Sequence, residues 1–339
     1  MKVKSIYIAI STALLTLTFM ACQEEVLHEG PCQVRFVASV QDEVSVTRAT
    51  EGYTALSQTD YPNFTAGLYV SYGTTAQEYP IEWANNNALT ANLGLEAYSD
   101  PYYFYGYAPK QNDASFDNSN KTLTIPNIPG LSDKDMLVIK PCSATVTSDD
   151  ISNGKKTISL QMDHLMAKIT PYFYINSEYN KLRDIHIKNV TFSLDDSKTF
   201  QANVSYTTSP YVTEWSIINK NQSQSVNLYS AAPSDTKIFL TTSSTGAQSY
   251  GQCYIVPSQN GQDITNLKMT VTYDVYDKQQ QLVRQNETAT NKVVVKVGGI
   301  TKTQLEAGKN YKLNIQIIPT YLYVLSDNDE SSVLVIPNN

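Results

Sequence analysis

Residues 33–40 read Gln-Val-Arg-Phe-Val-Ala-Ser-Val, with an apolar side chain at every second position. Successive side chains of a β-strand point to opposite faces of its sheet, so this period of two predicts a strand with one buried face. The residues expected on the buried face are Val34, Phe36, Ala38 and Val40.

The same alternation recurs along the rest of the chain, and no segment has the period of a long amphipathic helix. We expect further strands at residues 66–72, 101–108, 122–125, 136–139, 157–162, 167–175, 183–194, 202–206, 225–229, 237–241, 251–256, 267–276, 292–297 and 311–318. Turn-forming clusters such as Asp117-Asn-Ser-Asn120 separate them. Many short strands divided by turns are typical of β-sandwiches, so we predict an all-β chain.

The first 22 residues have the pattern of an export signal. Lys2 and Lys4 precede an apolar run at residues 6–21, and Cys22 follows directly. A basic start, an apolar core and a small residue before a cysteine are typical of a bacterial lipoprotein signal, in which Cys22 is acylated and becomes the mature N-terminus. The apolar run is shorter than the ~20 residues that span a bilayer as a helix. We therefore expect a lipid-anchored protein that acts outside the cytoplasm.

Removal of residues 1–21 leaves roughly 320 residues, more than one hydrophobic core usually serves, so we expect two domains. The polar stretch 147–156 is the best boundary, although its Asn-Gly pair would equally fit a hairpin turn inside one domain. The formal net charge of −7 and the lack of a long basic block argue against nucleic acid and anionic lipid as partners.

The remaining cysteines are Cys32, Cys142 and Cys253. An odd number cannot pair completely, and the spacings match no metal motif. We favour three small buried hydrophobic residues over a disulfide, and whether Cys142 pairs with Cys253 stays open.

No set of residues forms a catalytic pattern. The three histidines have no zinc-ligand spacing, and the chain lacks a nucleophile elbow, a phosphate loop and a nucleotide fingerprint. His164 could pair with the adjacent Asp163, but we favour a partly buried histidine at a strand entry. Asp195-Asp196 and residues 326–332 could ligate calcium, but we favour solvated acidic turns. Aromatic residues 102–107 are expected mainly in core and cross-strand pairs; if exposed, they would stack on sugar. We predict no enzyme, no metal and no cofactor.

Two terminal segments are distinct from this body. Arg48 and Ala49 lie in a small polar stretch where an arginine-specific protease could cut between them; the alternative is an ordinary loop arginine. After Pro319, residues 321–325 and 332–336 form two short apolar strands that cannot make a core alone. They must pair with their own sheet or with a neighbouring molecule by strand addition.

Together these ends suggest a mechanism. Loss of strand 33–40 after a cut at Arg48 would leave unpaired backbone groups and an empty groove. Four inward side chains at roughly 1.5–3 kcal/mol each amount to about 6–12 kcal/mol of lost burial. A tail strand from another subunit would fill the groove with alternate side chains, Tyr321, Tyr323 and Leu325 or Val333 and Val335. Because donor and acceptor surfaces differ, the contact would grow a filament.

Several short motifs follow one another over nearly the whole chain. They are Phe19-Met-Ala-Cys22, Thr47-Arg-Ala49, Gly67-Leu-Tyr-Val70, Phe104-Tyr-Gly-Tyr-Ala-Pro109, His164-Leu-Met-Ala-Lys-Ile169, Tyr254-Ile-Val-Pro257 and Leu305-Glu-Ala-Gly-Lys-Asn-Tyr-Lys-Leu313. In this order the chain resembles the fimbrillin family of Bacteroidales-type fimbriae, the FimA-like and Mfa-like subunits.

The resemblance implies two tandem transthyretin-like β-sandwich domains in a lipoprotein precursor exported to the outer membrane. It implies lipidation of Cys22, an acidic surface signal at residues 23–25, cleavage after Arg48 by an arginine- or trypsin-type protease, and polymerisation through a C-terminal donor strand. The expected parts are a signal peptide at 1–21, a propeptide at 22–48, domains at 49–152 and 153–319, and a donor tail at 320–339.

The implied partners are other fimbrial subunits, including anchor and tip proteins, and an adhesion ligand that the sequence does not identify. Family members also serve as basal anchors or tips, while Arg48 and the tail favour a shaft subunit. The competing interpretation is a surface glycan-binding lipoprotein of similar build, with an exposed aromatic platform and a tail folded into its own domain.

Overall fold

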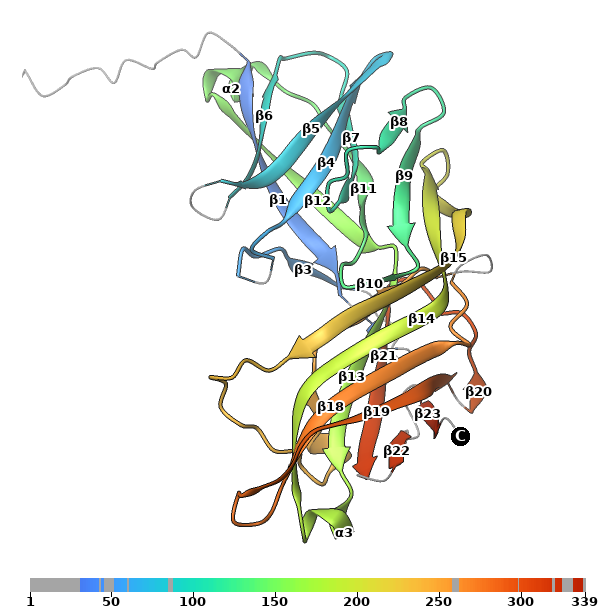
Figure 1. Ribbon diagram of the computed structural model, residues 1–339. Helices are drawn as coiled ribbons and strands as arrows, with labels where there is room; N and C mark the ends of the chain where they lie inside the picture. The colour runs from blue at the N-terminus through green and yellow to red at the C-terminus, as the bar shows by residue number, and fades with distance from the viewer. Residues whose placement is uncertain are drawn as a thin grey trace, which may run out of the picture.

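The computed structural model describes residues 31–42, 44–45, 52–59, 61–84, 88–257, 262–297, 299–318, 321–324 and 332–337. Over these residues the chain is all-β, as predicted, with its strands in three sheets (Figure 1). The helical segments described are α2 (Ser148–Ser152), α3 (Ser177–Asn180) and a 3-10 turn at Ser244–Gly246.

The first sheet contains eight strands in the order β12-β11-β7-β4-β5-β6-β1-β3, and β12 also pairs with β1. The sheet therefore closes on itself into a barrel, with β3 continuing beyond β1. The strands are β1 (Cys32–Gln41), β3 (Tyr53–Ala55), β4 (Thr65–Tyr72), β5 (Thr75–Ala84), β6 (Ala88–Leu95), β7 (Tyr102–Ala108), β11 (Leu137–Ala144) and β12 (Lys155–His164).

Close packing inside this barrel depends on a glycine in β7. A Cβ on Gly106 would lie 2.4 Å from the carbonyl oxygen of Gly67 and 2.8 Å from Cδ1 of Ile139. Glycine lets the neighbouring strand β4 and the side chain from β11 approach at this point. The flanking Phe104 points into the barrel core, whereas Tyr105 and Tyr107 pack on the outer face.

The second and third sheets enclose the core of the C-terminal half. The second contains β2 (Val44–Ser45), β10 (Leu131–Ser132), β13 (Ala167–Ile175), β16 (Gln248–Ser249), β17 (Cys253–Ile255), β21 (Lys309–Ile318) and β22 (Tyr321–Val324). The third contains β8 (Ser115–Asp117), β9 (Thr122–Pro129), β14 (Asp184–Ser205), β15 (Val212–Ser230), β18 (Leu267–Tyr276), β19 (Leu282–Val297), β20 (Ile300–Thr301) and β23 (Ser332–Pro337).

One long strand joins the two halves of the molecule. The first part of β14 pairs with β18, and its last residues pair with β9 from the N-terminal half (Figure 1). A separate apolar cluster forms where β9, β14 and β15 cover the outer face of the barrel, with Tyr105, Tyr107 and Phe200 among its members. The two halves thus share buried surface and a continuous sheet.

Several predicted strands are corrected by the structure. Residues 183–194 and 202–206 form one strand, β14, because strand pairing continues through the polar residues between them. Residues 237–241 form only an isolated bridge, between Phe239 and His186. Strands β5 and β6 were missed, since β5 is largely polar, contains Pro80 and has few buried side chains.

The division into two domains stays a prediction, and the pairing of β12 is informative about where it lies. This strand lies in the first sheet, between β11 and β1, and the Asn153-Gly154 pair falls in the connection from α2 to β12. The next strand, β13, belongs to the second sheet. We propose that the division lies between His164 and Ala167 rather than at residue 153.

Among the residues that the structure describes, no helix is long and apolar enough to cross a membrane. Cys32, Cys142 and Cys253 are free thiols. Cys32 lies in the barrel core, Cys142 packs against that core, and Cys253 lies in the C-terminal core. Separate positions keep Cys142 and Cys253 unpaired, and burial raises the pKa of the Cys142 thiol to about 11.

Candidate functional site: the first strand and its groove

Strand β1 is held on both sides in the barrel wall. It pairs in parallel with β12 over eight residues, from Gln33 opposite Lys155 to Val40 opposite Met162. On its other side it pairs antiparallel with β6 near its start and with β3 near its end. A strand in this position closes the barrel, so its departure would open a groove between β12 and β6.

The alternation predicted for residues 33–40 is confirmed. Val34, Phe36, Ala38 and Val40 are all buried in the barrel core, and Cys32 extends the same face. Phe36 is 2% exposed and meets the ring of Phe104 edge-on, with ring centroids 6.5 Å apart. The intervening Val37 is 48% exposed. The fully buried side chains of β1 therefore all lie on one face of the strand.

The start of β1 is fixed by the turn that precedes β12. The Gln33 N–H donates to the carbonyl of Gly154 at 3.2 Å. Nearby, Thr147 and Asp150 form a reciprocal capping box on α2, and Lys156 of β12 donates to the Asp150 carboxylate at 2.8 Å. The bond from Lys156 holds the pKa of Asp150 below its usual value. These contacts anchor the β12 side of the groove.

The other end of β1 is tied to a buried histidine. His164 Nε2 contacts the carbonyl oxygen of Gln41 at 2.8 Å, and Nδ1 contacts the carboxylate of Asp135. Both acceptors are oxygen atoms, so both ring nitrogens donate only when the imidazole is protonated. The alternative that His164 pairs with the adjacent Asp163 is therefore wrong. Asp163 instead accepts from the hydroxyls of Tyr53 at 2.5 Å and Tyr211 at 2.7 Å.

The Asp163 contact links three parts of the fold. Tyr53 lies on β3, beside β1, and Lys140 of β11 donates to its hydroxyl at 3.1 Å. Burial is the main cause that raises the pKa of Tyr53, and the bond to Asp163 adds to it. Tyr211 comes from the start of the β15 region, so Asp163 joins the barrel to the hairpin that covers it. No sequence spacing signals this contact, because its members come together only through the fold.

Strand β2, which follows β1, and the first tail strand, β22, both lie along β21. Strand β2 pairs with β21 at Lys309 and Asn310, and β22 pairs with it from Ile315 to Ile318. The second tail strand, β23, pairs with β19. Both predicted donor strands therefore pair with their own chain, which is one of the two arrangements expected for them. Tyr321, Tyr323, Val333 and Val335 lie in these two strands.

The other predicted site residues lie outside the described part of the chain: Cys22, Arg48, Ala49 and Leu325. Of the three remaining arginines, Arg35 and Arg284 lie in strands, and Arg183 lies in the turn before β14 rather than in a strand.

Within the described residues, no group of three or more histidine, cysteine or acidic side chains is placed to hold a metal ion. Asp195 pairs with Lys268, and Asp196 accepts from Asn266.

A scan against models of protein families finds no match, and a search of curated proteins finds none either. Solved structures of similar shape include candidate cell adhesion proteins from Bacteroides ovatus and Bacteroides uniformis. The first is 13% identical with a TM-score of 0.48, covering 91% of this chain and 100% of the other. The second is 12% identical with a TM-score of 0.42, covering 88% of this chain and 96% of the other.

A fimbrial protein from Bacteroides vulgatus is 13% identical with a TM-score of 0.34, covering 86% of this chain and 98% of the other. These neighbours carry the names of cell adhesion and fimbrial proteins. Identities and TM-scores of this size do not assign the present chain to a family.

Proposed function

We propose that this protein is a structural subunit of cell-surface fimbriae that polymerises by donor-strand exchange. In this proposal Cys22 carries the lipid of an outer-membrane precursor. A protease cuts between Arg48 and Ala49, β1 leaves, and the C-terminal tail of another subunit takes its place. The observation that carries the proposal is the position of β1, a strand in the barrel wall whose apolar face is buried in the barrel core.

The geometry supplies an energetic reason for control by proteolysis. The four inward side chains of β1 correspond to about 6–12 kcal/mol of apolar burial, enough to keep the uncut strand in place. A cut at Arg48 would leave β1 held by non-covalent contacts alone, so that another strand could compete for the groove. An uncut precursor would then be locked as a monomer, and assembly would follow cleavage.

The segment next to the cleavage point also supports the proposal. Strand β2 continues from β1 into the second sheet and occupies the edge of β21 next to the part that β22 covers. Release of residues before Ala49 would therefore free edge positions in both halves of the molecule. Each tail strand lies at the edge of its sheet, so it can detach without separating two strands inside that sheet.

The test uses unlipidated protein that begins at Gln23, treated with an arginine-specific protease and run by SDS-PAGE without boiling. The expected result is a cut after Arg48 followed by a ladder of high-mass species. Arg48→Ala should abolish both, and deletion of residues 321–339 should allow the cut and abolish the ladder. Arg183→Ala is the matched control, because it removes a turn arginine while leaving the ladder intact.

A clean cut after Arg48 with no ladder would overturn the proposal of a polymerising subunit. The same result would favour a non-polymerising anchor or tip. A ladder that forms equally from the Arg48→Ala protein would overturn the role of cleavage as the release step.

A further inference from the structure

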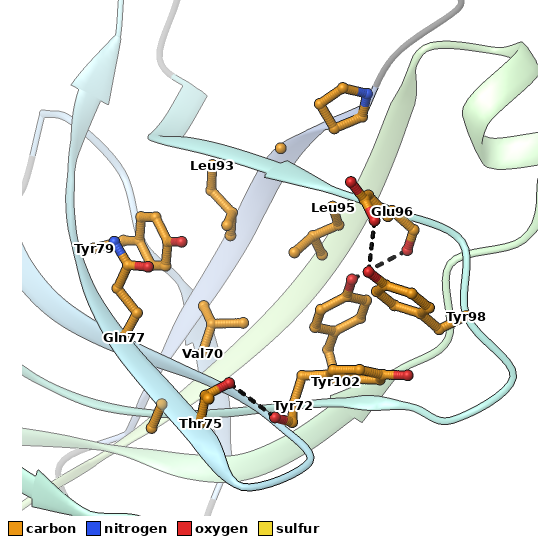
Figure 2. Close-up of a pocket in the computed structure, with 13 residues that line it drawn as sticks. Val70, Tyr72, Thr75, Gln77, Tyr79, Leu93, Leu95, Glu96, Tyr98 and Tyr102 are labelled. Atoms are coloured by element: carbon orange, nitrogen blue, oxygen red, sulfur yellow. Dashed lines mark hydrogen bonds between the residues drawn. The ribbon is translucent and has the colours of Figure 1, made fainter.

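The barrel has an open mouth at the end where β1 begins, and tyrosines surround it. A cavity of about 390 Å³ lies there, lined by β4, β5, β6, the loop after β6, and β7 (Figure 2). Its size is near the lower end of the range for small-molecule sites, and barrel mouths are a common place for them. Its floor is formed by apolar residues of the barrel core, Val70, Leu93 and Leu95.

Aromatic rings form two walls above this floor. On one side Tyr98 stacks on Tyr72 with ring centroids 4.5 Å apart, and Tyr102 lies 5.0 Å from Tyr72. Tyr79 of β5 stands with Gln77 on the other side (Figure 2). Tyr98 is 40% exposed, which leaves part of its ring open to a ligand.

Hydrogen bonds hold the first wall in position. The Tyr98 hydroxyl donates to the Glu96 carboxylate at 2.5 Å, and the Tyr102 hydroxyl donates to the Glu96 carbonyl at 3.2 Å. The hydrogen bond to the Glu96 carboxylate raises the pKa of Tyr98 to about 12. The wall is therefore preorganised by the loop after β6 rather than by the ligand.

The rim keeps unused hydrogen-bonding capacity. Within the described residues, the amide of Gln77 and the hydroxyl of Tyr79 have no intramolecular hydrogen bond, and one oxygen of the Glu96 carboxylate accepts none. Among the described residues that line the cavity, Glu96 is the only charged one. The absence of lysine and arginine from this lining argues against a phosphate, sulfate or carboxylate ligand.

We propose that this cavity binds a neutral hexopyranose unit of a glycan. A pyranose has apolar C–H faces that pack on aromatic rings and an edge of hydroxyls that needs both donors and acceptors. The uncovered part of the Tyr98 ring and the Tyr79 ring offer apolar faces, Gln77 and the Tyr79 hydroxyl offer donors and acceptors, and the free oxygen of the Glu96 carboxylate accepts from a sugar hydroxyl. A cation cage fits less well, because Tyr72 and Tyr98 cover each other's faces instead of turning them to one centre.

The test uses the uncut chain from Gln23, so its outcome is independent of cleavage and polymerisation. Saturation-transfer NMR is recorded with the methyl glycosides of glucose, galactose, mannose and N-acetylglucosamine, and with tetramethylammonium as a cationic probe. At least one glycoside should receive saturation at its ring C–H protons. Tyr98→Ala and Gln77→Ala, in different elements, should each raise its dissociation constant at least tenfold.

The matched control is Tyr103→Ala, which removes a tyrosine that is 44% exposed and does not line the cavity. It should leave the dissociation constant unchanged. Each variant is first compared with the parent by circular dichroism, and Gln77 is an exposed position where the variant is expected to fold. Saturation of no glycoside, binding of tetramethylammonium alone, or equal binding by all three variants would overturn the proposal.

Discussion

Truncation of Phe36 tests whether one face of β1 holds the strand in its groove. Phe36→Ala removes a ring that is 2% exposed and packs against Phe104, whereas Val37→Ala removes a side chain that is 48% exposed on the same strand. Loss of a buried phenylalanine costs about 3–5 kcal/mol, and an exposed substitution is usually within about 0.5 kcal/mol. We expect a value in the upper part of the first range, because β12 and β6 fix the groove from both sides.

The assay is hydrogen exchange of the amides of β1, followed by mass spectrometry on native protein. A loss of 3–5 kcal/mol in the free energy of opening corresponds to exchange that is about 10² to 10⁴ times faster. The same amides in Val37→Ala should exchange within about threefold of the parent. Similar exchange of β1 in both variants would refute the reasoning, since burial of one face would then not hold the strand.

Three further predictions concern the fold. Gly106→Ala should cost about 1–3 kcal/mol in chemical denaturation, because its Cβ would meet the backbone of Gly67; an unchanged midpoint would contradict this. Asp150→Asn should lower the melting temperature at pH 7, because Lys156 lowers the pKa of the Asp150 carboxyl in the folded protein. The carboxylate's contribution to stability is present above pH 3.8 and is lost as the pH falls through the folded pKa. The melting temperatures of parent and variant should therefore converge in acid, and a constant difference between them would refute this. Native protein should react slowly with a thiol reagent and react fully only after unfolding, because Cys32, Cys142 and Cys253 are packed in or against the cores.

The alternation of apolar and polar side chains in the sequence predicts strand positions and their buried faces. The inward face of β1 follows from side-chain alternation, and β13 and β18 have the bounds predicted from the same signal. Residues 104–107 are buried on both faces because the hairpin of β14 and β15 covers the outside of the barrel there, whereas Tyr103 stays exposed. Alternation alone does not distinguish this from a half-exposed strand.

The rest depends on contacts between distant segments. Parallel pairing of β1 with β12 joins residues more than one hundred positions apart, and no local pattern specifies it. The bonds of His164 to Asp135 and Gln41 arise in the same way, and adjacency to Asp163 in the sequence does not reveal them. The tyrosine cavity likewise draws on four strands and a loop, of which β5 and β6 lack a clear strand signal.

The central claim is that a tail from one chain enters the groove that β1 leaves in another. Single cysteines are placed at the positions of β12 opposite outward residues of β1, such as Ser159, which pairs with Val37. Each is combined with Leu334→Cys, which faces outward if Val333 and Val335 enter the groove. The account predicts a disulfide between chains that forms under oxidising conditions only after cleavage at Arg48. It should form with only one of the cysteine positions tested along β12. A ladder without any such cross-link, or the same cross-link in uncut protein, would contradict it.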